Sequence, residues 1–214
     1  MKSIKTSSAF LSALVPVIFL LILSGCSGEE KKLPYLGKMH FEHGKAVYPV
    51  IADFSFLDQD GRVVTNSTFK NKIYVADFFF TSCPTICPRM AVEMKKTYQA
   101  YSGNPRIFFL SHTIDPEHDT QEKLKQYAEH LEVAGNKWFF VTGKKEEIYS
   151  IAVNSYFSAA FADSSAPGGY VHSGGLLLID TNRHIRGVYD GTDPGETERL
   201  IADISVLLKE EFKD

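Results

Sequence analysis

The chain has 214 residues, 44% of them hydrophobic and 23% charged, which is ordinary for a globular protein. This length accommodates one sizeable α/β domain together with a leader. The net charge is −3 and no long basic run occurs, so the composition argues against a nucleic-acid-binding protein.

The N-terminus has the pattern of a bacterial lipoprotein leader. Lys2 and Lys5 precede an apolar run over residues 9–23, which ends in Leu-Ser-Gly and Cys26. A positive start, a short apolar core and small residues before a cut point predict a signal peptide over residues 1–25. The ending resembles the lipobox, which implies cleavage before Cys26 and lipid on its sulfur. An uncleaved membrane anchor is the alternative, but the run is short for a span and contains a proline.

Residues 26–47 are predicted to form a polar tether, irregular over 27–45, and residues 48–214 a single folded domain. The sequence over 53–65 predicts a β-hairpin around the turn at Asp60-Gly61. The next segment, residues 72–80, is almost continuously apolar and rich in aromatic residues. Such a run is typical of a buried central strand.

Strands and helices alternate through the rest of the chain. Pro88 suits the first turn of a helix, Asp119 with Glu122 forms a capping-box pattern, and Asp193 followed by a proline opens the last helix. The predicted elements are helix 88–101, strand 106–114, helix 119–131, strand 138–143, helix 145–157, small-residue loop 158–175, hairpin 176–190 and helix 194–209. This order predicts an α/β protein of thioredoxin-like fold, with a central mixed sheet flanked by helices and an N-terminal β-hairpin.

Cys83 and Cys87 lie between the apolar strand and its helix, each followed by proline. A disulfide that closes so short a loop removes little unfolded-state entropy, so a purely structural role is disfavoured. A helix N-terminus favours the thiolate, which is both the nucleophile of disulfide exchange and a soft ligand for copper(I). At four positions apart on a helix, the two sulfurs would share one face. Redox chemistry and metal binding therefore both stay open.

His172 is the best candidate for a third metal ligand. It precedes the strand that, in a thioredoxin-like sheet, runs antiparallel to the cysteine strand, so its start lies beside the end of that strand. His112 and His118 also lie near this edge of the sheet, but we expect each to be a solvated or hydrogen-bonded side chain.

Asp77 is the one acidic residue in the buried strand, six residues before Cys83. The segment VADFFFTSC resembles the thioredoxin segment with its buried aspartate, which implies that Asp77 moves protons to and from the thiols. The alternative is a carboxylate bonded to backbone or to a lysine.

Four segments in order resemble the Sco/SenC family over nearly all of residues 48–210: FFFTSCPTICP, SHTIDPEHDTQEKLKQYAEHL, WFFVTG and YVHSGGLLLIDTNRHIRGVYDG. The resemblance implies a thioredoxin-like lipoprotein on the extracytoplasmic (periplasmic) face of a bacterial membrane, binding a copper ion through Cys83, Cys87 and His172. The implied partner is subunit II of cytochrome c oxidase, whose dinuclear copper centre the family helps assemble. The family acts by delivering copper, by reducing the partner's cysteines as a thiol–disulfide oxidoreductase, or both.

A peroxidase is the third hypothesis. TSCPT resembles the peroxiredoxin loop, but its threonine lies two rather than three residues before Cys83, and no matched arginine partner is evident. The sequence therefore favours the other two readings over a peroxidase.

Overall fold

The structure, a computed structural model, describes residues 32–133 and 136–212. The predicted signal peptide and Cys26 lie outside these ranges. Within the described part of the chain, no helix has both the length and the apolar character needed to cross a bilayer.

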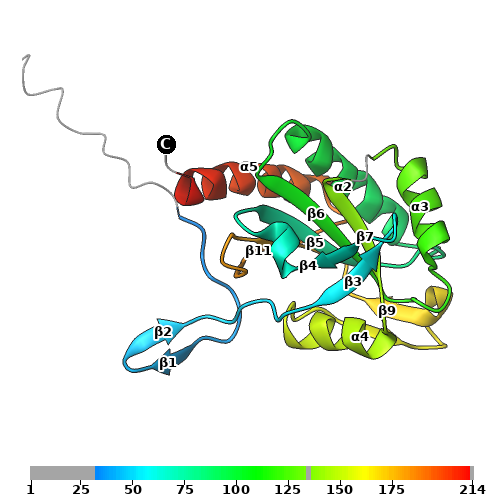
Figure 1. Ribbon diagram of the computed structural model, residues 1–214, viewed down its shortest axis with the longest axis horizontal. Helices are drawn as coiled ribbons and strands as arrows, with labels where there is room; N and C mark the ends of the chain where they lie inside the picture. Colours follow the sequence, from blue (N-terminus) through cyan, green and yellow to red (C-terminus); the bar gives the residue numbers. More distant parts are fainter. Residues whose placement is uncertain (1–31, 134–135, 213–214) are drawn as a thin grey trace, which may run out of the picture. The chain divides into compact units, whose positions relative to one another are not determined.

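A seven-stranded mixed sheet forms the centre of the domain (Figure 1), in the order β11-β10-β5-β6-β7-β3-β4. The three central strands are parallel to one another, and every other pairing is antiparallel. The strands are β3 (Ser55–Asp58), β4 (Val63–Thr65), β5 (Ile73–Phe79), β6 (Ile107–Thr113), β7 (Trp138–Thr142), β10 (Gly175–Ile179) and β11 (Ile185–Asp190). This arrangement confirms the predicted thioredoxin-like fold, including its N-terminal hairpin, β3–β4.

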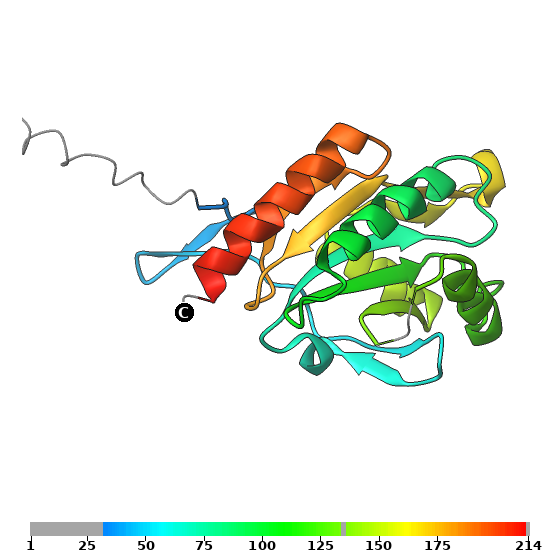
Figure 2. The same cartoon turned by 90° about the horizontal axis from the view of Figure 1, so that it is seen from above.

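Four helices cover the two faces of the sheet: α2 (Cys87–Tyr101), α3 (Gln121–His130), α4 (Lys145–Asn154) and α5 (Pro194–Glu211). Helices α2, α3 and α5 pack on one face, and α4 packs on the other (Figures 1 and 2). Parallel strands that follow one another in one direction require right-handed crossovers, which place α2 and α3 on the same side. The 3₁₀ turns are η1 (Asn66–Phe69) and η2 (Pro167–Gly169).

Strand β5 is the centre of the core, and all of its residues are buried. Helices cover both of its faces, so both sets of alternating side chains leave water, which explains the unbroken apolar run. Asp77 is the exception among these side chains, with only 4% of its surface exposed.

Two short antiparallel pairs lie where the sequence predicted irregular structure. Strands β1 (His40–Glu42) and β2 (Lys45–Val47) form a hairpin inside the predicted tether, with His43 and Gly44 at positive φ in the turn. Strands β8 (Ala160–Ala162) and β9 (Tyr170–His172) pair inside the predicted loop. Each strand has only three residues, and neither pair joins the central sheet, so hydrophobic alternation carries almost no signal.

Residues 33–36, which we term the N-terminal strap, are bound to the domain although they also fall within the predicted tether. Leu33 is buried, its N–H donates to Glu210, and the Leu36 N–H donates to the carbonyl of Ile185. The guanidinium of Arg186 donates to the Leu33 carbonyl at 2.6 Å, and it pairs with Asp180 at 3.2 Å. A charged side chain is therefore buried with partners on the strap and on the sheet.

The helix starts agree with the sequence at two of three positions. Pro88 lies in the first turn of α2, and the Asp193 carboxylate caps α5 by accepting the N–H of Gly195. The predicted cap at Asp119 is wrong by one residue: Thr120 caps α3 through its side chain. The Asp119 carboxylate instead belongs to the site described below.

Candidate metal centre

The loop before α2 and the first turn of α2 hold the two cysteines. Helix α2 begins at Cys87, so Cys83 lies in the preceding loop. The spacing of four residues had suggested that both cysteines lie on one face of the helix. Ile86 occupies the N-cap position and supplies no side-chain cap. The sulfur of Cys83 lies 3.7 Å from the Thr85 hydroxyl, and the backbone N–H groups of Thr85 and Cys87 act to lower its pKa. Donors at a helix N-terminus thus favour the anionic form of this sulfur.

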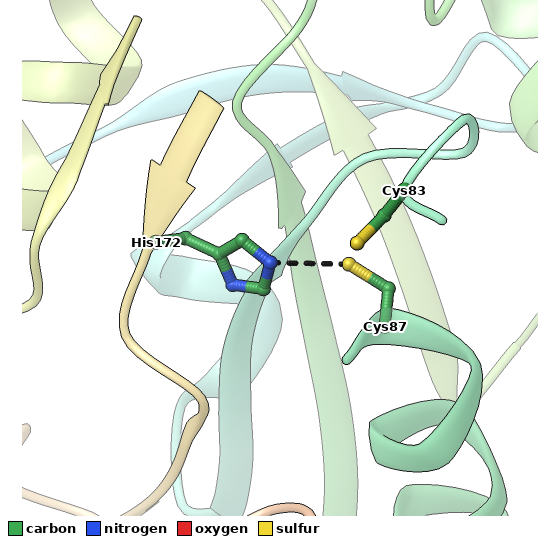
Figure 3. Close-up of side chains that lie close together, drawn as sticks. All are labelled: Cys83, Cys87 and His172. Carbon is green, nitrogen blue, oxygen red and sulfur yellow. Dashed lines mark hydrogen bonds between the residues drawn. The ribbon is translucent and has the colours of Figure 1, made fainter. Parts of the chain in front are cut away.

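His172 reaches the sulfurs because β10 runs antiparallel to β5, with Leu177 opposite Ala76. This register returns the chain to the end of β5, where the cysteine loop begins, as the sequence analysis expected. The imidazole Nε2 lies 3.1 Å from the Cys87 sulfur (Figure 3). One donor atom each from Cys83, Cys87 and His172 lie within 4.8 Å of one another.

The protonation of the imidazole follows from its contacts. The Nδ1 atom of His172 lies 3.3 Å from the carbonyl oxygen of Ser173, an acceptor, so Nδ1 carries the hydrogen in the neutral ring. Nε2 then presents a lone pair to the Cys87 thiol. Burial lowers the pKa of His172 below its usual value, which keeps the ring neutral and available as a ligand.

The two thiols have different acidities. Burial raises the pKa of Cys83, but hydrogen bonds from the Cys87 thiol and from the N–H groups of Thr85 and Cys87 outweigh it, so the pKa lies below its usual value. Burial raises the pKa of Cys87 well above its usual value, and the hydrogen bond to Cys83 and the nearby Cys83 and Asp77 charges act in the same direction. Both thiols are free, and Cys83 is the more nucleophilic of the two.

Asp119 holds the start of the cysteine loop in place. Its carboxylate accepts the Thr81 N–H at 3.0 Å, the Thr81 hydroxyl, and the Thr113 hydroxyl at 2.5 Å. Thr113 ends β6, and Thr81 follows β5, so the carboxylate ties the loop to the carboxyl end of the sheet. The contact of Asp119 with the cysteine loop was not predicted from the sequence, because the capping-box pattern assigned Asp119 to the helix cap. Two threonines at the ends of adjacent parallel strands were the available signal.

Asp77 lies beneath the site on β5, and burial raises its pKa to about 7, against a hydrogen bond from Ser111 that lowers it. Among the described residues, the structure records no hydrogen bond from the backbone or from a lysine to this carboxylate. Its Oδ1 atom is buried without a partner. The Asp77 charge also raises the pKa of Cys87, so the carboxylate and this sulfur are electrostatically coupled.

The two histidines at the same edge of the sheet behave differently. His118 is exposed and its Nδ1 lies 2.9 Å from Asp115, as predicted. His112 is fully buried with no hydrogen bond to either ring nitrogen, so the prediction of a solvated or hydrogen-bonded side chain is wrong for this residue. The ring stacks on Phe78 at 5.0 Å, and burial lowers the pKa of His112 to about 3. It acts as a core aromatic residue and does not reach the sulfurs.

Two thiolates and a neutral imidazole form a ligand set suited to a soft cation such as copper(I). Three donors bound to one ion at about 2.0–2.3 Å lie about 4 Å from one another. The Cys87 sulfur and His172 Nε2 are closer than this, at 3.1 Å, and all three donors lie within 4.8 Å, so shifts of about 1 Å bring the three side chains onto one ion.

A thioredoxin-like sheet that carries a dithiol and an imidazole at one edge defines a class of thiol proteins that can bind a soft metal ion. Comparison with known families identifies the branch. The sequence model described as SCO1/SenC matches residues 43–209, and the chain belongs to this family.

Relatives and solved structures agree with this assignment. The chain is 28% identical over 191 residues to the "SCO1 protein homolog" of Bacillus subtilis, which covers 87% of this chain and 91% of the relative. It resembles the crystal structure of a SCO1/SenC family lipoprotein from Bacillus anthracis, with a TM-score of 0.67 and 28% identity over 74% of this chain and 94% of the other.

Two further structures bear on the chemistry of the family. BsSco, a member of the Sco family of cytochrome c oxidase assembly proteins in which a disulfide switch was identified, has a TM-score of 0.66 and 26% identity, covering 78% of this chain and 95% of the other. ScoI of Bradyrhizobium japonicum, solved with copper bound, has a TM-score of 0.63 and 23% identity, covering 74% and 99%. At that identity, the ScoI likeness shows the fold alone.

Proposed function

We propose that this protein binds one copper(I) ion through Cys83, Cys87 and His172 and delivers it to the dinuclear copper centre of cytochrome c oxidase subunit II. The convergence of three soft or borderline donors from two distant segments is the observation that carries the proposal. The soft donor set supports the choice of metal. The description of BsSco as a member of the Sco family of cytochrome c oxidase assembly proteins supports the choice of partner.

The arrangement suits a metal that is cargo. A copper(I) ion replaces the proton of the Cys87 thiol, whose sulfur lies 3.1 Å from His172 Nε2, and the lowered pKa of Cys83 supplies the second thiolate. Cys83 and Cys87 lie under the surface, with 8% and 3% of their area exposed, so the bound ion is shielded from water yet close to it. An incoming cysteine of the partner would reach the ion by ligand exchange without unfolding of the site.

Copper(I) titration of the reduced protein in competition with a chromophoric chelator tests the ligand set. The wild type should bind one equivalent, and replacement of Cys83 or Cys87 with serine, or of His172 with alanine, should weaken binding at least about ten-fold, the loss of one ligand bond. His130→Ala removes an exposed histidine on α3 and is the control for loss of a histidine. Equal affinity of wild type and His172→Ala would contradict the ligand assignment.

The second candidate function is reduction of the partner's cysteines, favoured by the difference between the two thiols. The Cys83 thiolate attacks a partner disulfide, forms a mixed disulfide and releases one partner thiolate. Cys87 then loses its proton and attacks the Cys83 sulfur, which forms the Cys83–Cys87 disulfide and releases the second partner thiolate. Two electrons pass to the partner, and we propose that Asp77, whose pKa is raised to about 7, takes the proton of Cys87.

The two functions separate in variants. The first step of exchange uses Cys83, whereas the hydrogen bond of the imidazole is to Cys87, so His172→Ala should retain mixed-disulfide formation while losing copper. Asp77→Asn should retain copper binding but slow the closure of the second disulfide. Transfer of copper to the reduced copper-binding domain of subunit II, followed by its visible absorption, then shows which activity assembles the centre.

We also propose that the mature chain begins at a lipid-bearing Cys26 and is held on the extracytoplasmic face of a bacterial membrane. The leader pattern and the lipoprotein nature of the relative from Bacillus anthracis support this location. Cys26→Ser should release the protein from the membrane fraction and abolish incorporation of labelled fatty acid. Fatty acid retained by the variant would contradict the assignment.

A further inference from the structure

The strand that carries His172 lies outside the central sheet. Strand β9 pairs with β8, with Ala162 opposite Tyr170 and Ala160 opposite His172, and this two-stranded sheet is separate from the central sheet. A hairpin of three-residue strands is marginal by itself. The distance from the imidazole to the sulfurs therefore depends on side chains that tie the hairpin to the domain.

Tyr170 makes the most direct of these ties. Its hydroxyl donates to Asp115 Oδ1 at 2.7 Å, and its ring packs on Phe80 with centroids 5.2 Å apart. Tyr170 and His172 are two residues apart on a strand, so they point to the same side. The His172 ring meets Phe80 edge-on at 5.8 Å, so one phenylalanine, just before the cysteine loop, contacts both side chains.

Asp115 is a rigid acceptor for this tie. It is buried, its N–H donates to the Thr113 hydroxyl at 3.0 Å, and its carbonyl accepts the Asp119 N–H at 2.8 Å. Asp119 is the same residue whose carboxylate anchors the cysteine loop. The tyrosine hydroxyl is therefore connected, through Asp115 and Asp119, to the segment that places the sulfurs.

We propose that Tyr170 is a positioning residue for the metal, and that its hydrogen bond to Asp115 holds His172 within coordinating distance of the two sulfurs. The inference rests on the proposed copper function of the same site. Loss of the hydroxyl leaves the ring on Phe80 but releases the hairpin, so the imidazole meets the sulfurs less often. The hydroxyl and ring contacts of Tyr170 are to Asp115 and Phe80 and not to the thiols, which keep their reactivity.

Tyr170→Phe tests the proposal, with Tyr149→Phe as its matched control. The Tyr149 hydroxyl donates to the Ile114 carbonyl at 2.9 Å from neighbouring α4, and Lys145 approaches both tyrosine rings. Tyr170→Phe should weaken copper(I) binding about ten-fold, as expected for loss of one hydrogen bond to a carboxylate. Tyr149→Phe should leave the affinity unchanged, and the alkylation rate of Cys83 should stay the same in both variants.

A double-mutant cycle separates positioning from general destabilisation. In the His172→Ala background, with a chelator weak enough to report the residual affinity, Tyr170→Phe should have no further effect. An affinity equal to wild type in Tyr170→Phe, or the same loss with and without His172, would overturn the inference.

A metal-free measurement keeps this result separate from the proposed function. The Ser173 N–H donates to the Ala159 carbonyl across the base of the hairpin, so its hydrogen exchange reports whether the hairpin is held. Exchange over residues 160–175 should accelerate in apo Tyr170→Phe but not in Tyr149→Phe. If the wild type failed to bind copper, the proposed function would be wrong, but the exchange rates would still test whether Tyr170 holds the hairpin. Unchanged exchange in apo Tyr170→Phe would overturn the inference about Tyr170.

Discussion

Replacing His112 with phenylalanine is expected to make the protein more resistant to mild acid. The imidazole is fully buried among aromatic rings, stacked on Phe78 and edge-on to Phe56, and neither nitrogen has a hydrogen-bond partner. Protonation would bury an unpaired charge, which is why the pKa of His112 falls to about 3 from an ordinary value of 6.5. Phenylalanine fits the same aromatic surroundings and cannot be protonated.

The sign follows from proton binding. Between pH 6.5 and about 3 the unfolded chain binds a proton at His112 and the folded chain does not, so the free energy of unfolding falls as the pH falls. Each pH unit below 6.5 costs about 1.4 kcal/mol, or about 2 kcal/mol at pH 5.0. Asp77 acts in the opposite direction, because its pKa of about 7 in the folded state adds stability as the pH falls from 7 towards 3.8. This second contribution is common to wild type and variant and cancels in their difference.

Urea denaturation of wild type and His112→Phe at pH 7.5 and pH 5.0 measures the effect. The stability of the variant relative to wild type should rise by about 2 kcal/mol on going to pH 5.0. Removal of the exposed His130 on α3, as His130→Gln, controls for the loss of a histidine in general. A difference between wild type and His112→Phe that stays constant with pH would refute the argument that the buried ring resists protonation.

Four other outcomes are expected. Limited alkylation near pH 8 followed by peptide mapping should label Cys83 well before Cys87, and equal labelling would contradict the difference in their acidities. Asp119→Ala should lower the free energy of unfolding by about 3 kcal/mol, measured in urea, because the Thr81 and Thr113 donors lose a carboxylate. Arg186→Met should cost a similar amount, about 3 kcal/mol, and expose the strap to limited proteolysis, because Asp180 becomes an unpaired buried charge. Copper(I) at 100 times its Kd should stabilise the wild type by about 2.7 kcal/mol in the same assay, and His172→Ala should gain less at that concentration.

The central sheet was predictable because its buried strands have apolar sequence patterns that can be recognised. An unbroken apolar run such as residues 72–80 requires cover on both faces, and the alternation of such runs with helical periodicity specifies parallel crossovers. The short pairs β1–β2 and β8–β9 were not predictable, because each strand has only three residues, and all of these except Ala160 are exposed or half-buried. The N-terminal strap was missed because its binding depends on Arg186, a charged residue far away in the sequence.

The site was predictable where topology alone brings residues together. The antiparallel pairing of β10 with β5 brings the segment that carries His172 to the end of the sheet where the cysteine loop begins. The environment of a single side chain was less accessible: the sequence shows neither that His112 is buried without a partner nor that Asp119 turns towards Thr81. Those outcomes depend on rotamers and on burial by segments distant in the chain.

The strap has a consequence for how the ligands are presented to a partner. It fastens Leu33 to Glu210 at the carboxyl end of α5, whereas Asp193, which opens α5, lies by the edge of the sheet that carries the sulfurs. The 18 residues of α5 rise by about 27 Å, and residues 27–32, fully stretched, span at most about 25 Å from Cys26 to Leu33. The strap thus fixes the point at which the chain before Leu33 leaves the domain, at the end of α5 that is remote from the donor atoms. If Cys26 carries the proposed lipid, its attachment to the domain is on that side, and the side with the donor atoms is left for a partner.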